Sequence, residues 1–137
     1  MTCIRLDEGE EFWCAGNHYR MLVPRDETHC LEAALETFQP GKGTPPNGHD
    51  TFVQLLIFFE GRAEVHIDGQ VREMDAPGLA FVPLNTDHHV VNTGAGELKY
   101  VYVSIWPGQM PEHEDKPWKE VCARMIDYYT SRGFPPQ

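Results

Sequence analysis

The sequence is poor in basic residues and has no long hydrophobic run. It contains 11 lysine and arginine residues against 21 aspartate and glutamate residues, so the formal net charge is −10. Such a surface repels the phosphate backbone of nucleic acids and anionic lipid headgroups, and we expect neither as a partner. The longest unbroken apolar run is LLIFF at residues 55–59. A helix that spans a bilayer needs about 20 apolar residues, so the sequence predicts none.

Cysteines are few and scattered, and no two of them form a Cys-x-x-Cys pair; they are Cys3, Cys14, Cys30 and Cys122. The first residues, MTCIRLDEGEEFW, lack the basic region and the apolar segment of a secretory signal peptide. We therefore expect free thiols and a cytoplasmic location rather than a disulfide framework. No histidine or aspartate lies in local register with these cysteines, so the sequence does not support nucleophilic catalysis.

Proline and glycine separate short runs that are rich in β-branched and aromatic residues. The 137 residues include 11 prolines and 12 glycines, and 41% of them are hydrophobic, which is typical of one turn-rich globular domain. The runs expected to form strands are 19–23, 53–60, 63–68, 79–83, 89–92 and 98–106. Many short strands with Gly and Pro between them predict an all-β sandwich or barrel. Residues 30–38, CLEAALETF, alternate as a strand does but consist of helix formers, so both structures stay open there.

The C-terminal segment changes from a period of two to a helical period. Its apolar residues recur at i, i+3, i+4, i+7, i+8 and i+11, as Trp118, Val121, Cys122, Met125, Ile126 and Tyr129. This pattern predicts an amphipathic helix over about 116–132. We interpret the helix as a lid packed on the β core, and a helix that binds a partner is the alternative.

The run 53–60, VQLLIFFE, is apolar on both faces. Alternate residues of a strand point to opposite faces: Gln54, Leu56 and Phe58 to one, Leu55, Ile57 and Phe59 to the other. A strand with one face in water would alternate apolar and polar residues. Either another part of the domain covers the second face, or that face meets another copy of the protein. We expect a homodimer through this face.

Two motifs, in the right order, resemble those of the cupin superfamily. The first family motif is Gly, five residues, His-x-His, three or four residues, Glu, six residues and Gly. This chain has Gly41, Asn47-Gly48-His49, Gln54 and Gly61 at that spacing. The second family motif is Gly, five residues, Pro-x-Gly, two residues, His, three residues and Asn. Here the chain has Pro77, Pro83-Leu84-Asn85, His88 and Asn92. The resemblance extends over roughly residues 30–106 and favours a strand at 30–38.

The resemblance implies an all-β fold, a cupin-type jelly-roll β-barrel with a C-terminal α-helix. It implies a single domain over residues 1–137, with the barrel core at about 19–107. It also implies a metal inside the barrel mouth. Carried over position by position, the ligands are Asn47, His49, Gln54 and His88. A divalent transition metal (Fe, Mn, Ni or Zn) is then the expected cofactor.

Two of these four positions depart from the family pattern. Asn47 replaces a histidine and Gln54 replaces the glutamate, so the set has two imidazoles, two amide oxygens and no anionic ligand. Without the carboxylate, nothing neutralises a cation in the low-dielectric barrel. We therefore expect weak metal binding or a vacant site. Asn85, at a family glycine, is a milder change because asparagine tolerates positive φ.

Other polar residues near the motifs are weaker candidates. His89 follows His88 and so faces the opposite side of its strand, and His66 is expected to point outward. Tyr100 and Tyr102 share one face of the last strand. They are either core aromatics or catalytic acid–base groups.

The sequence supports two functions. The first is a metal-dependent cupin enzyme, such as a dioxygenase, isomerase or decarboxylase, that acts on a small organic molecule. The second is a binding module that holds a small sugar or organic acid without turnover, with a weakened or vacant metal site. In both cases the partner is a small-molecule ligand or substrate.

Overall fold

The computed structural model describes residues 2–137, which form nine β-strands and two α-helices. The strands are β1 (Glu10–Cys14), β2 (Asn17–Val23), β3 (Leu31–Phe38), β4 (Val53–Glu60), β5 (Arg62–Ile67), β6 (Gln70–Asp75), β7 (Gly78–Val82), β8 (His88–Asn92) and β9 (Leu98–Ile105). The helices are α1 (Arg25–Thr28) and α2 (Trp118–Thr130).

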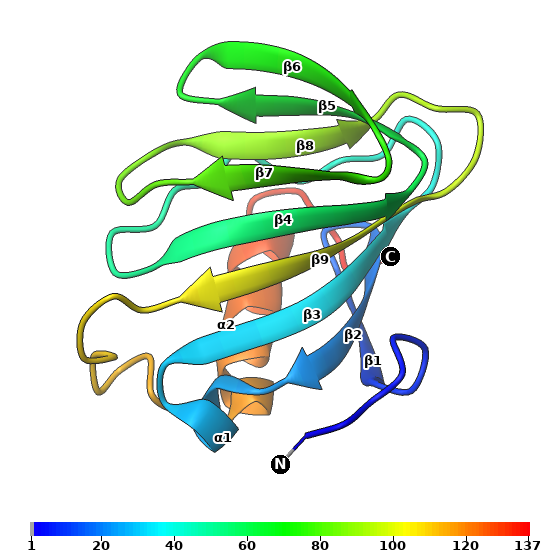
Figure 1. Cartoon of the computed structure of the whole chain (residues 1–137). Coiled ribbons are helices and arrows are strands. Elements are labelled where there is room, and N and C mark those ends of the chain that lie inside the picture. The colour runs from blue at the N-terminus through cyan, green and yellow to red at the C-terminus, as the bar shows by residue number, and fades with distance from the viewer. Residues whose placement is uncertain (1) are drawn as a thin grey trace.

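The strands form two antiparallel sheets (Figure 1). The larger sheet has six strands in the order β1-β2-β3-β9-β4-β7, and the smaller sheet has three in the order β6-β5-β8. In the middle of the larger sheet, the last strand β9 lies between β3 and β4, so pairing joins distant parts of the chain. The architecture is an all-β jelly roll with a C-terminal helix, as predicted.

Strand β3 is the segment for which the residues alone left helix and strand open. Each of its eight residues pairs with β9, and β2 pairs with its other edge. Two ladders of backbone hydrogen bonds and burial on both faces outweigh the helix propensity of its Ala, Leu and Glu residues. Strand alternation then places Glu32 and Glu36 on the inner face, together with Ala34 and Phe38.

Strand β4 has the predicted bounds, but the pattern missed β1, β6 and the short helix α1. Strands β1 and β6 are the outermost strands of their sheets, and most of their side chains are exposed. An edge strand with little burial has a weak apolar alternation, so hydrophobic periodicity does not reveal it.

Aromatic residues dominate the core between the sheets. Phe38 and Phe58 pack on Tyr100, with ring centroids 5.4 Å and 5.0 Å from it. Val65 and Val90 of the smaller sheet complete this cluster. The cluster fills one end of the space between the sheets. The polar inner-face residues lie toward the opposite ends of β3, β4 and β9.

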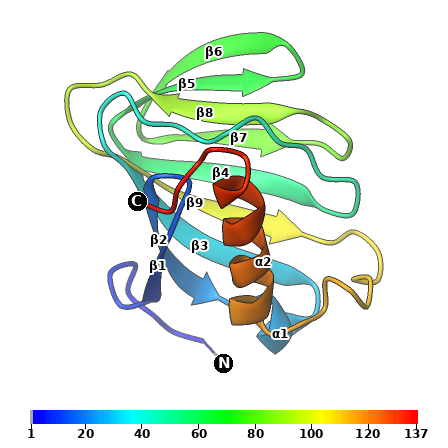
Figure 2. The same cartoon turned by 180° about the vertical axis from the view of Figure 1, so that it is seen from behind.

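Helix α2 covers the inner face of the larger sheet on the β1–β3 side (Figure 2). The buried residue Cys122 packs with Met21 and Ala34, and the Trp118 ring centroid lies 5.7 Å from that of Phe12. The predicted helix is therefore present and packs on the β core. Within residues 2–137, no helix is long and apolar enough to cross a membrane.

The outer face of the larger sheet is apolar, and in the described chain no helix lies over its β4 and β7 strands (Figure 1). On β4, Leu55 and Ile57 are half-buried and Phe59 is 49% exposed. On the neighbouring edge strand β7, Leu79 and Phe81 are 56% and 53% exposed. The predicted two-faced apolar pattern of β4 is confirmed, and its outward row remains accessible to a partner.

Candidate functional site

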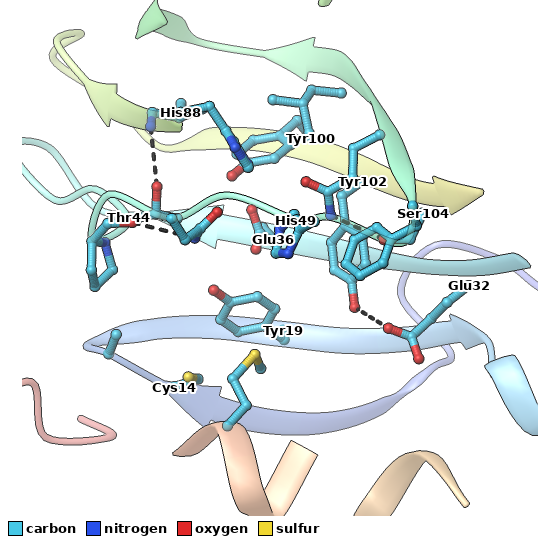
Figure 3. A pocket seen from close by; sticks show the side chains of 18 of the residues that line it. Cys14, Tyr19, Glu32, Glu36, Thr44, His49, His88, Tyr100, Tyr102 and Ser104 are labelled. Carbon is cyan, nitrogen blue, oxygen red and sulfur yellow. Dashed lines mark hydrogen bonds between the residues drawn. The ribbon is translucent and has the colours of Figure 1, made fainter. Parts of the chain in front are cut away.

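A cavity of about 120 Å³ lies between the sheets beside α2 (Figure 3). Its wall combines residues of β1–β4, β8, β9 and α2 with residues of the loop 39–52. One water needs roughly 10–15 Å³ of such space, so the cavity has room for a small organic molecule. All the residues that the sequence singled out for the site line this cavity: Asn47, His49, Gln54, His88, Tyr100 and Tyr102.

The loop between β3 and β4 brings the two motif regions together. The backbone N of Asn47 donates to the carbonyl oxygen of His88 at 3.0 Å. In return, the backbone N of His88 donates to the carbonyl oxygen of Asn47 at 2.8 Å. The carbonyl oxygen of His49 accepts a hydrogen bond from the backbone N of Asn85 at 2.7 Å. Asn85 has a φ of 56°, the positive value that asparagine was expected to tolerate. The imidazole rings of His49 and His88 thus lie with centroids 5.4 Å apart.

Both imidazoles are neutral at pH 7. Burial, and to a smaller extent the proximity of His88, lowers the pKa of His49 to about 4. Burial also lowers the pKa of His88, although hydrogen bonds with the backbone of Thr86 and Asn47 act in the opposite direction. Nδ1 of His88 lies 3.5 Å from the carbonyl oxygen of Thr86. When Nδ1 donates there, Nε2 carries the free lone pair, which is the arrangement of a metal-binding histidine.

The two amide nitrogens donate to different partners, and neither amide oxygen accepts a hydrogen bond from a described residue. Gln54 Nε2 donates to Ser104 Oγ at 3.0 Å, which leaves Gln54 Oε1 free for other partners. Asn47 Nδ2 donates to the carbonyl oxygen of Pro45 at 3.3 Å and to the Tyr129 hydroxyl at 3.4 Å. Asn47 Oδ1 is buried and accepts no hydrogen bond from any described residue. A buried acceptor without a donor is costly, and a cation would supply its missing partner.

The ligand atoms of this set are of types that divalent transition metals accept, but none of them carries a negative charge. Neutral imidazoles and amide oxygens are acceptable ligands for such a metal. Among residues 2–137, however, no group of three or more His, Cys, Asp or Glu residues has the geometry to hold a metal ion. No carboxylate stands among these four residues, so no ligand would neutralise the charge of a bound cation directly. The site therefore fits a weakly held metal.

A second polar group in the cavity was missed by the sequence reasoning. Glu36 lies opposite Tyr19 of β2 and Tyr100 of β9 in the register of the sheet (Figure 3). Burial raises the pKa of Glu36 to about 7, although hydrogen bonding by Tyr100 and Tyr19 acts in the opposite direction. The sequence of residues 31–38, LEAALETF, could have predicted this group. Glu32 and Glu36 are four residues apart, so a strand there places both carboxyl groups on one face.

Nearer the start of β3, Glu32 forms a buried ion pair with Arg25. Arg25 Nε donates to Glu32 Oε2 at 2.7 Å, and Arg25 Nη2 donates to Glu32 Oε1 at 3.2 Å. The Tyr102 hydroxyl donates to Glu32 Oε1 at 2.9 Å. The Arg25 guanidinium also lies 5.0 Å from the ring centroid of Trp106. Tyr102 is therefore engaged in a structural network of the cavity wall, whereas Tyr100 faces Glu36.

The other histidines lie outside this cavity. His66 and His89 stack with ring centroids 4.0 Å apart on the outer face of the smaller sheet. Nε2 of His66 contacts Glu64 Oε1 at 2.6 Å. The expectations that His88 and His89 face opposite sides of β8 and that His66 points outward are confirmed.

The four cysteines are free thiols. Cys14 lines the cavity, and burial raises its pKa to about 11. Burial also raises the pKa of Cys122, on the inner side of α2, to about 12. Both stay protonated at neutral pH, and a protonated thiol is a poor nucleophile.

Comparison with known families agrees with the two sequence motifs. A family model described as Cupin domain matches residues 34–106, which is more than half of the chain. The chain therefore belongs to the cupin family. No curated protein matches it at a significant level.

Solved structures with this fold are numerous but distant in sequence. A predicted oxalate decarboxylase from Thermotoga maritima has a TM-score of 0.69 and 18% identity, covering 76% of this chain and 98% of that chain. A Cupin 2 conserved barrel domain protein from Salinispora arenicola has a TM-score of 0.64 and 22% identity, covering 96% and 98%. KdgF from Halomonas has a TM-score of 0.59 and 20% identity, covering 72% and 83%. These similarities establish the shared fold, and a fold alone does not define a reaction.

Proposed function

We propose that the protein is a metal-dependent cupin enzyme that acts on a small organic molecule held in the cavity. The observation that carries the proposal is the close approach of two neutral imidazoles, His49 and His88, in the wall of one cavity. The buried, unpartnered oxygen of Asn47, whose backbone pairs with His88, supports it. Ionisable groups with perturbed pKa values gather at functional sites; burial lowers the pKa of His49 to about 4 and lowers that of His88 as well.

In this proposal His49 and His88 are the main metal ligands, and the amide oxygens of Gln54 and Asn47 complete the set. Fe, Mn, Ni and Zn are the candidate metals because each accepts imidazole nitrogen. When bound, such a metal acts as a Lewis acid that polarises a carbonyl group, a carboxylate or a water. The surrounding residues of the chain enclose the substrate and limit its contact with bulk water.

The absence of a carboxylate beside the two imidazoles favours a second function. In this alternative the cavity binds a small sugar or organic acid without turnover. The Gln54 amide, held through its nitrogen by Ser104, can offer its oxygen to a ligand hydroxyl as well as to a metal. Metal binding is the property that separates the two functions.

His88→Ala is expected to abolish the binding of Mn, Fe, Ni or Zn that we expect of the wild-type protein. His88 lines the cavity and supplies one of only two imidazole ligands. His89→Ala is the matched control, because the neighbouring imidazole points to the outer face of the sheet. Isothermal titration calorimetry with each metal, on protein purified without a His tag, measures the difference. A wild-type protein that binds none of the four metals would contradict the enzyme proposal and support the binding module.

We also propose a homodimer formed through the outer face of β4 and β7. In the register of these strands Leu55 lies opposite Phe81, and Ile57 lies opposite Leu79. Together with Phe59, these side chains form an apolar patch of which three members are about half exposed. Contiguous apolar patches on a protein surface mark interaction sites. An identical patch on a second copy would cover it by two-fold symmetry.

Phe81→Glu is expected to convert this dimer into a monomer, because it places a charge within the apolar patch. Val71→Glu is the matched control: Val71 is 56% exposed, close to the 53% of Phe81, but lies on β6 of the smaller sheet. Sedimentation velocity at tens of micromolar, roughly where a standard-size interface holds, measures the change. A wild-type protein that sediments as a monomer there would rule out this interface.

The cytoplasm is the compartment that we propose. The free thiols of all four cysteines support this proposal, since exported proteins of this size commonly pair their cysteines.

A further inference from the structure

We propose that Glu36 is the acid–base group of the cavity, and that it moves a proton to and from a carbon atom beside a carbonyl group of the substrate. This inference rests on the proposed function, since it takes the same cavity as the substrate site. Of the three candidate reactions, oxygenation, isomerisation and decarboxylation, it selects isomerisation, in which a proton is transferred to and from carbon.

Glu36 is placed in the cavity wall by its neighbours on both sides. Tyr19 on β2 and Tyr100 on β9 are its direct partners in the register of the sheet. All three side chains are buried from bulk solvent, and all three line the cavity. Figure 3 shows Glu36 between the two tyrosines. A molecule that fills the cavity therefore touches the Glu36 carboxyl group, while bulk water does not.

No cation in the described chain compensates the charge of Glu36. The titratable groups that influence or face it are all uncharged at neutral pH: Cys14 of β1, Tyr19 of β2, Tyr100 and Tyr102 of β9, and Tyr129 of α2. On its own strand, Glu32 is the next carboxylate. Arg25, the arginine of the cavity wall, is already bound to Glu32 through two hydrogen bonds.

Structural stability does not explain a carboxyl group in this position. A buried carboxylate without a cation loses its hydration, and a glutamine or leucine would avoid that cost. The same surroundings suit acid–base chemistry. Burial brings the pKa of Glu36 to about 7, so the ionised and protonated forms are both populated at neutral pH. A group in this condition can accept a proton and give it back.

The proposed step conserves atoms and electrons. The ionised Glu36 carboxylate removes a proton from the carbon next to the carbonyl group; the C–H bond breaks, an O–H bond forms on Glu36, and the electron pair shifts to give an enolate. The Glu36 carboxylic acid then returns the proton to the same carbon or to a conjugated one. The first outcome is proton exchange and the second is isomerisation. Nothing is oxidised or reduced, and no co-reactant is needed.

Tyr19 and Tyr100 act as positioning residues in this scheme. Their hydrogen bonding favours the ionised form of Glu36 and opposes the effect of burial on its pKa. Removal of either hydroxyl should therefore raise the pKa of Glu36. A change in the pH profile follows only if Glu36 itself takes part in the reaction.

The inference is tested by the uptake of deuterium from D2O into three probes: pyruvate, acetoacetate and dihydroxyacetone. Proton NMR monitors the loss of the probe protons. Each probe is small enough for a cavity of about 120 Å³. The wild-type protein, with Mn added, is expected to accelerate exchange of the protons beside the carbonyl group of at least one probe, with a pH inflection that reports the titration of Glu36. Glu36→Gln should slow that exchange by roughly 10²- to 10⁴-fold. Glu112→Gln, at an exposed carboxyl group, is the matched control and should leave it unchanged.

Tyr100→Phe supplies a second readout that does not depend on the folding of Glu36→Gln. It is expected to move the inflection to higher pH, because it removes a hydroxyl group that lowers the pKa of Glu36. An inflection that stays in place in both Tyr100→Phe and Tyr19→Phe would overturn the assignment of Glu36 as the reacting group.

Metal binding, measured on the same samples, distinguishes failure of this inference from failure of the proposed function. Exchange that is lost in Glu36→Gln while metal binding is retained supports both. A wild-type protein that binds metal but exchanges no probe proton faster than Glu36→Gln overturns the inference alone. Exchange that depends on Glu36 in a protein that binds no metal supports the inference and overturns the metal dependence.

Discussion

Replacement of Arg25 by methionine is expected to lower the free energy of unfolding by about 3–5 kcal/mol. Glu32 is 3% exposed, and Arg25 is its cationic partner through two hydrogen bonds. Loss of the guanidinium leaves a carboxylate buried without compensation, which costs more than the ion pair itself contributes. Arg25 Nη1 also donates to the carbonyl oxygen of Glu114 at 3.4 Å, so the loop before α2 loses a contact as well. Urea unfolding followed by circular dichroism measures the loss.

Two further variants show whether the loss comes from the buried charge. Arg20→Met is the matched control: the Arg20 side chain is 31% exposed and lies 3.7 Å from the exposed Glu11, so less than about 1 kcal/mol should be lost. Arg25→Met combined with Glu32→Gln should recover much of the stability, because the amide carries no charge and can still accept the Tyr102 hydrogen bond. An Arg25→Met protein within about 1 kcal/mol of the wild type would show that solvent reaches this pair.

Gln54→Glu is expected to tighten the binding of Mn, Fe, Ni or Zn by roughly tenfold or more. The substitution restores the family's carboxylate and places a negative charge beside the cation. The side chains are nearly equal in size, so Leu56 and Phe58 on the same face should not move. The Ser104 hydroxyl, which accepts a hydrogen bond from Gln54, can rotate to donate to the new carboxylate. Calorimetry with each metal, compared with the wild type, measures the gain.

The same variant gives the opposite result if the cavity is a metal-free ligand site. The new carboxylate is then buried without a cation, its pKa rises, and the protein loses about 1–3 kcal/mol of stability near neutral pH. Gln70→Glu is the matched control, since it makes the same chemical change at an exposed position of β6. Melting curves with and without metal separate the two cases. A Gln54→Glu protein that is less stable and gains nothing from any of the four metals would refute the metal site.

Local sequence patterns were sufficient to predict the strands that carry the motif residues. Alternation along 53–60 predicted the bounds of β4, and the family resemblance predicted that Gln54 faces the pocket, where it lines the cavity. Alternation also separated His88, in the cavity, from His89 on the outer face. These properties depend on the period of a single strand, so neighbouring residues contain the necessary information. The family resemblance then brought His49 and His88 together across the loop.

The sequence by itself therefore determined the class of fold, the core strands and the residues of the two motifs. Only the tertiary structure decided the chemistry around Glu36. Its neighbours Tyr19 and Tyr100 are far from it in the chain and reach it through the pairing of β3 with β2 and β9. The structure likewise decided which side of β4 stays uncovered, because Leu56 and Phe58 on its inner face pack with Val65 and Val90 of the smaller sheet. Burial and pKa depend on which distant groups surround a side chain, and no local periodicity specifies those groups.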